Sequence, residues 1–241
     1  GKYLCTFNGY ISDTNYSGTA TYVDVNLITP SWNGGSYKRK FIHKIVLLAD
    51  KMTSTFTSEE KANIYNLKKH LKFHMDDNGI GTYSNPNMVI AGGFFSTMLG
   101  ESPHYNDLDV FILNNNEGLF QNCIQTTTYK WKVNNNIGRL TSYFNNPHIM
   151  GTAKNDQNKV QYILTDYKTR EDLIASFDFV HCTINYVPIT DKLYITRRAY
   201  DANKKKELRF VGVTPAQQWR SQKFLRRGWK IPVTDTMSIR A

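Results

Sequence analysis

The sequence has no long hydrophobic run, few cysteines and almost no acidic residues near its C-terminal end. No apolar stretch approaches the ~18–20 residues that a membrane helix needs, and no secretory signal pattern opens the chain, so we expect no membrane partner. The three cysteines are widely spaced and form neither a metal motif nor a disulfide framework. We therefore expect a reducing, cytoplasmic location, which would be that of the host cell if the protein is viral.

The acidic deficit is local. The whole chain has 30 basic and 20 acidic side chains, but residues 192–241 hold 13 basic and 3 acidic ones, which leaves residues 1–191 balanced at 17 of each. A concentrated basic segment is typical of a protein that meets a polyanion, either a nucleic acid or a triphosphate. A solvated basic surface or a contact with an acidic protein are the alternatives.

The most informative stretch is residues 88–113. An apolar run over 88–91 leads into Gly92-Gly93 and a short helical stretch, and a polar loop then delivers Asp107 and Asp109 at the start of a second apolar run. Residues two apart on a strand share a face, so the two carboxylates project together and repel each other unless a cation lies between them. Paired glycines at a strand-to-helix turn let backbone N–H groups approach a phosphate. The pattern favours a Mg²⁺-dependent phosphoryl- or nucleotidyl-transfer site.

Gly92-Gly93, thirteen intervening residues and then Asp107-Leu108-Asp109 resemble the signature of the DNA polymerase beta-like nucleotidyltransferase superfamily. The layout is most similar to the head domain of tRNA CCA-adding enzymes and bacterial poly(A) polymerases, although Ser96-Thr97 stands where those enzymes usually carry an Arg-Asp pair. The resemblance implies two Mg²⁺ ions, with Mn²⁺ possible, and a third carboxylate.

Asp178 is the candidate for that third carboxylate. A strand at 159–164, a short helix at 170–175 and an apolar strand over 176–186 that Asp178 opens follow the order of the same superfamily, and the Phe-Asp-Phe form resembles small viral and phage enzymes. An Asp at a strand start is otherwise a solvated residue or a cap.

Further candidates lie on the helix after Gly93 and in the basic segment. Ser96 lies in the first turn of this helix. Its hydroxyl either donates to a phosphate oxygen or belongs to an ordinary helix surface, and the sequence does not decide between these two interpretations. Thr196 caps a predicted helix from Arg197 to Glu207, and a second helix begins at Thr214-Pro215 and ends at Gly228. We assign nucleotide binding to Gly92, Gly93, Ser96, Arg197 and Arg198, and nucleic-acid binding to Lys204, Lys205, Lys206, Arg220, Lys223, Arg226 and Arg227.

The expected fold class is α+β, with a mixed sheet that carries the three Asp residues and helices packed on one face. We expect a small β-rich element at 1–36, a nucleotidyltransferase core at 37–191 with an Asn-rich insertion of hairpins and loops at 114–159, and a basic helical segment at 192–241. Within the core, Thr57 and Glu60 form a capping-box pattern that opens an amphipathic helix ending at Asn78-Gly79.

The sequence thus predicts a Mg²⁺-dependent enzyme that transfers a nucleoside monophosphate from a nucleoside triphosphate to a hydroxyl, on an RNA 3′ end or another nucleic-acid acceptor, and releases pyrophosphate. The alternative is a catalytically silent protein of the same fold that serves as a structural or nucleic-acid-binding component of a phage particle.

Overall fold

The structure is a computed structural model, and it describes residues 56–80, 85–99, 107–125, 130–135, 146–155, 157, 159–211 and 218–232. The expected β-rich element at 1–36 lies outside these residues. The described residues form two compact units. We call residues 59–170 and 185–194 the sheet unit, and residues 56–58, 171–184 and 195–232 the helical unit.

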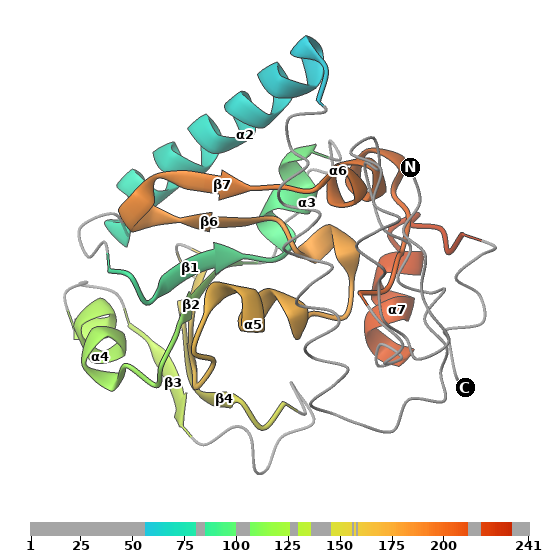
Figure 1. The fold of residues 1–241 in the computed structure, drawn as a ribbon. Coiled ribbons are helices and arrows are strands. Elements are labelled where there is room, and N and C mark those ends of the chain that lie inside the picture. The colour runs from blue at the N-terminus through green and yellow to red at the C-terminus, as the bar shows by residue number, and fades with distance from the viewer. Residues whose placement is uncertain are drawn as a thin grey trace, which may run out of the picture. The chain divides into compact units, whose positions relative to one another are not determined.

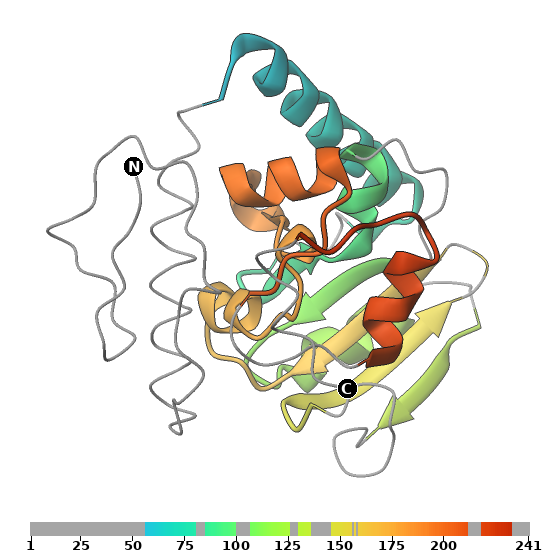
Figure 2. The same ribbon diagram turned by 90° about the vertical axis from the view of Figure 1, so that its right-hand side faces the viewer.

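The sheet unit contains one mixed sheet of seven strands in the order β3-β4-β5-β2-β1-β6-β7 (Figure 1). Strands β2 and β5 pair in parallel and all other neighbours are antiparallel. The strands are β1 (Met88–Ala91), β2 (Leu108–Ile112), β3 (Lys132–Asn135), β4 (Ile149–Asn155), β5 (Val160–Thr165), β6 (Asn185–Val187) and β7 (Lys192–Tyr194). Figure 2 shows neighbouring strands rotated relative to each other, the usual twist of a sheet.

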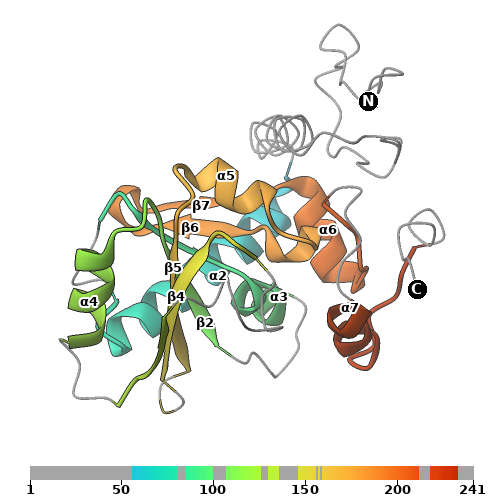
Figure 3. The ribbon, with the colours of Figure 1, turned by 90° about the horizontal axis from the view of Figure 1, so that it is seen from below.

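Three helices belong mainly to the sheet unit: α2 (Ser58–Asp77), α3 (Gly93–Leu99) and α4 (Glu117–Gln125). Helix α2 begins and ends where the capping pattern and Asn78-Gly79 predict, and Leu67, Leu71 and Met75 form its buried stripe. Helices α2 and α3 lie side by side (Figure 3), with the ring of His74 stacked on Phe94. No described helix is both long enough and apolar enough to cross a membrane.

Helices α2 and α4 cover the same face of the sheet, and Asp109 lies on the other. Asp109 is in register with Gln161 of β5 and, through Ala91 of β1, with Asn185 of β6, so these side chains share one face. Side chains alternate along a strand, so the next residues, Tyr162 and Tyr186, lie on the opposite face. Cys123 of α4 hydrogen-bonds to Tyr162 of β5, and its burial raises the pKa of the thiol to about 11. Tyr186 belongs to the network that holds α2. The helices therefore leave Asp109 on the other face.

Two sequence expectations need correction. The strand predicted over 176–186 is wrong for most of its length. Asp178 lies in a bend, Phe179 forms an isolated bridge with Phe210, a 3₁₀ helix η6 spans Val180–Cys182, and a strand forms only at β6. The four consecutive side chains at 179–182 are all buried, so the alternation that marks a half-buried strand is absent. A short apolar run of this kind does not by itself distinguish a strand from a helical segment.

The Asn-rich segment is the second correction. Its strands β3 and β4 form an antiparallel pair, as expected for a hairpin, and extend the main sheet, but we did not expect helix α4. Its asparagines form the start of α4: Asn114 and Asn115 adopt positive φ, and Asn116 Oδ1 accepts the backbone N–H of Leu119 as an N-cap.

The helical unit consists of α5 (Arg170–Ala175) from residue 171 on, η6, α6 (Arg197–Lys205) and α7 (Gln218–Leu225). Thr196 caps α6 as predicted, because its side chain accepts from Ala199 N at 3.0 Å. The predicted start of the last helix at Thr214-Pro215 lies outside the described residues. The core of the unit is formed by Phe179, Cys182, Leu208, Phe210, Phe224 and Trp229.

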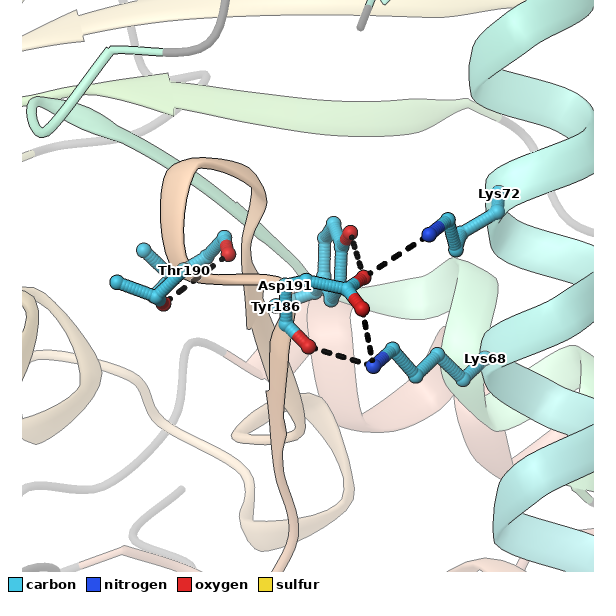
Figure 4. A network of polar contacts seen from close by, with 6 residues as sticks. Lys68, Lys72, Tyr186, Thr190 and Asp191 are labelled. Atoms are coloured by element: carbon cyan, nitrogen blue, oxygen red, sulfur yellow. Dashed lines mark hydrogen bonds and ion pairs between the residues drawn. The ribbon is translucent and has the colours of Figure 1, made fainter.

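Asp191 fastens α2 to the turn between β6 and β7 (Figure 4). Its carboxylate accepts from Lys68 at 2.9 Å, from Lys72 at 3.1 Å and from the Tyr186 hydroxyl at 2.8 Å. Hydrogen bonds from Lys68 and Tyr186 are the main reason that the pKa of Asp191 falls to about 2. Burial and the same carboxylate raise the pKa of Tyr186.

Replacing Asp191 by Asn is expected to loosen α2 from the sheet. Asn tolerates the φ of 52° at this position, so the change removes charge with little backbone strain. The pairs are half-exposed, so we expect a loss of at most about 1 kcal/mol in the free energy of unfolding, together with faster amide hydrogen exchange in α2. Asp76→Asn, the same charge change on α2 itself, is the control. Equal exchange in the two variants would contradict the role of Asp191.

His181 makes the helical unit sensitive to acid. Its imidazole is fully buried, with ring centroids 4.2 Å from Trp229 and 4.5 Å from Phe224. Burial, with a smaller contribution from the positive charge of Arg220, lowers the pKa of His181 from its ordinary 6.5 to about 3. The unfolded chain therefore binds one more proton than the folded chain between these two pH values.

Stability is expected to be complete above pH 6.5 and to fall as the pH drops toward 3. At pH 5 the free energy of unfolding should be about 2 kcal/mol lower than at pH 7.5 from this group alone. Urea unfolding at both pH values, followed by tryptophan fluorescence, measures the difference. In His181→Phe the difference should shrink, whereas His70→Gln, at an exposed position, should keep it. If the stability difference between the two pH values is unchanged in His181→Phe, His181 is not the group responsible for it.

Candidate active site

The site begins at the turn that joins β1 to α3. All four residues of β1 are buried, and the chain then turns through Gly92 with a φ of +101°, which side chains other than glycine rarely adopt. Gly93 opens α3, and Thr97 Oγ1 donates to its carbonyl at 3.2 Å. Ser96 is buried within α3 and does not lie on an open helix surface.

Gly92 lies against Asp109. Strands β1 and β2 are antiparallel with Ala91 opposite Asp109, so the carboxylate of Asp109 projects beside the turn. A Cβ atom placed on Gly92 would lie 2.7 Å from Oδ2 of Asp109. Both the backbone conformation and the space at residue 92 therefore require glycine.

Asp107 immediately precedes β2 and carries a basic partner. Lys154 of β4 donates from Nζ to Oδ2 of Asp107 at 3.0 Å, and the Asp107 side chain is only 13% exposed. The two carboxylates that the sequence paired thus lie at one end of β2, and the positive charge beside them comes from a lysine two strands away.

Register aligns a polar row across the sheet through Asp109. Each member is the direct cross-strand partner of the next, so all project from one face. In spatial order from β3 to β7 the row is Lys132, Lys154, Gln161, Asp109, Ala91, Asn185 and Tyr194.

Arg170 closes the row at its β7 end. Its guanidinium donates to Oδ1 of Asn185 at 3.2 Å and lies 3.7 Å from the centre of the Tyr194 ring. Sequence reasoning missed Lys154, Gln161 and the other row residues, because strand register aligns them with Asp109. It also missed Arg170, which reaches the row from the start of α5. The charged residues at 132 and 154 within strand-like runs were the sole local signal.

Asp178 belongs to the helical unit. Arg220 of α7 contacts its carboxylate through two nitrogens, Nε to Oδ2 at 2.5 Å and Nη2 to Oδ1 at 3.2 Å, and the Phe179 N–H donates to Oδ1 at 3.0 Å. Within the described parts of the chain, no group of three or more His, Cys, Asp or Glu side chains is arranged to hold a metal ion. The role of Asp178 as a third ligand stays a prediction.

The arginines assigned to nucleotide binding lie on α6. Arg197 forms an ion pair with Asp201 at 3.4 Å and lies over the ring of Phe56, at 4.3 Å from its centre. Arg198 is buried. Both side chains contribute to packing in the helical unit, and their role toward a nucleotide stays a prediction.

Backbone pairing gathers the basic residues after α6 and α7. Lys230 N donates to the Lys206 carbonyl and Leu208 N donates to the Lys230 carbonyl, both at 2.8 Å. This pairing joins the C-terminal end of α6 to the segment that follows α7. The exposed basic side chains of the two segments, which we call the basic surface, are Lys204, Lys205, Arg226, Arg227 and Lys230.

Gly92→Ala should damage the site, whereas Gly93→Ala should not damage the fold. An alanine at 92 is strained at φ +101° and its Cβ meets Asp109, so we expect a loss of about 1–3 kcal/mol in the free energy of unfolding. A Cβ at Gly93 has no neighbour within 4 Å, and Ala favours a helix, so that variant should be neutral or up to about 1 kcal/mol more stable. Urea unfolding of both variants tests this, and equal effects would contradict it.

Comparison with known proteins gives one family. A family model described as "Gad2: Gabija anti-defense 2 family protein" matches residues 53–206, close to two thirds of the chain. No curated protein matches the sequence.

Among solved structures, the chain is similar to CCA-adding enzymes. An apo CCA-adding enzyme matches with a TM-score of 0.49 and 14% identity over 71% of this chain and 41% of the other. The Thermotoga maritima CCA-adding enzyme complexed with tRNA matches with a TM-score of 0.46 and 18% identity over 73% of this chain and 40% of the other. The chain spans about two fifths of the length of these enzymes.

Proposed function

This chain belongs to the Gabija anti-defense 2 family. We propose that it acts against the Gabija defence named in the family description, and that it does so as a Mg²⁺-dependent nucleotidyltransferase. The proposed reaction transfers a nucleoside monophosphate from a nucleoside triphosphate to an acceptor hydroxyl, most simply one on a nucleic acid. The observation that carries the proposal is the approach of Asp109 to Gly92, which sets a carboxylate pair beside a glycine turn at the start of a helix.

The residues present fit a divalent cation. Asp107 and Asp109 offer carboxylate oxygens, the donors that Mg²⁺ prefers, and Gly92 leaves no Cβ between Asp109 and the turn. These two side chains would hold the cation, with Mn²⁺ as a substitute, and Asp178 is the proposed third ligand. When bound, the cation neutralises charge on the triphosphate and activates the attacking hydroxyl.

The chain's own residues position the reactants. The backbone of Gly92-Gly93 is proposed to approach the triphosphate, with Ser96 as a further donor. Attack forms a bond from the acceptor oxygen to the α-phosphorus, the bond from that phosphorus to the bridging oxygen breaks, and pyrophosphate leaves. The proton of the acceptor hydroxyl passes to a base, for which Asp178 is the candidate.

The basic surface of the helical unit is proposed to bind the phosphate backbone of a nucleic-acid acceptor. The basic surface presents five exposed cationic side chains. Beside it, the acidic Glu207 is already paired with Arg209 at 2.9 Å. Such a surface supports sequence-independent contacts to phosphates. Lys206, Arg220 and Lys223 are assigned to the same role, although Arg220 holds Asp178 in this structure.

One observation favours a catalytically silent member of the fold as the second candidate. Asp107 is paired with Lys154 and Asp178 with Arg220, so two of the three carboxylates have basic partners without any cation. A protein that acts by binding alone would keep both pairs permanently.

A transfer assay separates the two candidates. Wild-type protein, incubated with Mg²⁺, each α-labelled nucleoside triphosphate and a mixture of RNA, short DNA and protein extract, should label one acceptor class. The double change Asp107→Asn with Asp109→Asn should lower the rate by roughly a hundredfold or more.

Asp76→Asn with Asp77→Asn, which makes the same charge change at the end of α2, should leave the rate unaltered. A rate near wild type in the Asp107/Asp109 variant would contradict the proposal. No label under any condition, together with no Mg²⁺-dependent nucleotide binding, would favour the silent protein.

A further inference from the structure

We propose that Lys154 is a positioning residue that couples metal binding to triphosphate binding, a role that rests on the two-carboxylate site of the proposed function. Lys154 would neutralise Asp107 while no cation is bound and turn to the triphosphate once the cation arrives. The side chain would thereby make the cation and the nucleotide bind together more tightly than either binds alone.

Geometry restricts Lys154 to this site. Its backbone lies on β4, directly opposite Gln161 of β5, which is itself opposite Asp109 of β2. Adjacent strands lie about 4.8 Å apart, so the side chain must cross β5 to reach Asp107. It does so, with Nζ at 3.0 Å from Oδ2. The ammonium group is thus held over the face of the sheet from which both carboxylates project.

Charge explains why Lys154 must move. The carboxylates of Asp107 and Asp109, two residues apart, repel each other, and the lysine relieves this repulsion. A divalent cation that takes oxygens of the same carboxylates repels the ammonium, so the two compete for Asp107. A bound triphosphate brings several negative oxygens, which offer the displaced ammonium a new partner.

The exposure of the pair allows this exchange. The Lys154 side chain is 39% exposed whereas that of Asp107 is 13% exposed, so the carboxylate is held by its surroundings and the lysine has solvent on one side. The pair is only partly buried, which limits its net contribution to stability. The contact is therefore weak enough to be exchanged for a cation.

Lys132 provides a matched control. It carries the same charge on the neighbouring strand β3, directly opposite Lys154 in the same cross-strand row, and it is exposed. Replacing either lysine by Met changes the net charge of the protein equally and leaves a long aliphatic side chain. Lys154 forms an ion pair with Asp107 at 3.0 Å.

Mn²⁺ binding to the full chain, followed by electron paramagnetic resonance of the free ion, tests the proposal without catalysis. In the absence of nucleotide, Lys154→Met should bind Mn²⁺ roughly three- to tenfold more tightly than wild type, and Lys132→Met should bind like wild type. Addition of ATP or CTP should tighten Mn²⁺ binding strongly in wild type and less in Lys154→Met. Lys154→Arg, which keeps the charge, should restore the wild-type coupling.

The outcomes separate this inference from the proposed function. Tighter Mn²⁺ binding in Lys154→Met without any transfer activity in wild type would support the role of Lys154 and remove the transferase. Equal Mn²⁺ binding and coupling in wild type and Lys154→Met, with transfer intact, would overturn the role of Lys154 alone. Absence of Mn²⁺ binding in both proteins, at concentrations that saturate known magnesium enzymes, would overturn both.

Discussion

The repulsion between Asp107 and Asp109 is the constraint on which the site depends. Two carboxylates at one end of β2 need a positive charge beside them, and the fold supplies Lys154 from two strands away. The Asp109 carboxylate also needs space, and only glycine at position 92 leaves room for it. The adjacent strands, the turn and the lysine are thus arranged around one local concentration of negative charge.

The sheet meets this demand by dividing its two faces. Tyr162 and Tyr186 on one face contact Cys123 of α4 and the Asp191 network of α2, and the other face carries the polar row through Asp109. Because side chains alternate along a strand, a one-residue slip of β5 would exchange Gln161 for Tyr162 and place an aromatic ring in the polar row. Helix packing on one face therefore fixes register, and register assembles the polar row on the other.

How far the sequence predicts this site depends on the range of the interactions. The strand, glycine turn, helix and second strand at 88–112 are contiguous, so local pattern was sufficient to place Gly92, Asp107 and Asp109. Lys154 could not be placed, because its partner lies 47 residues away and pairing through β5 decides the contact. The strand predicted at 176–186 was wrong because a run of buried side chains does not distinguish a strand from a 3₁₀ turn. Helix α4 was missed because its asparagines were treated as a compositional bias, whereas they form a turn and a helix cap.

The two ion pairs at the predicted carboxylates differ in a way that bears on function. Arg220 grips Asp178 through two nitrogens in a planar fork, a geometry that favours a lasting structural contact. Lys154 reaches Asp107 through a single ammonium group at the end of a side chain that is 39% exposed. An exchangeable lysine screens the two carboxylates without blocking a cation. The two pairs therefore differ in how readily a cation could replace the basic partner: Lys154 can be displaced from Asp107, whereas any role of Asp178 toward a cation depends on the release of its arginine.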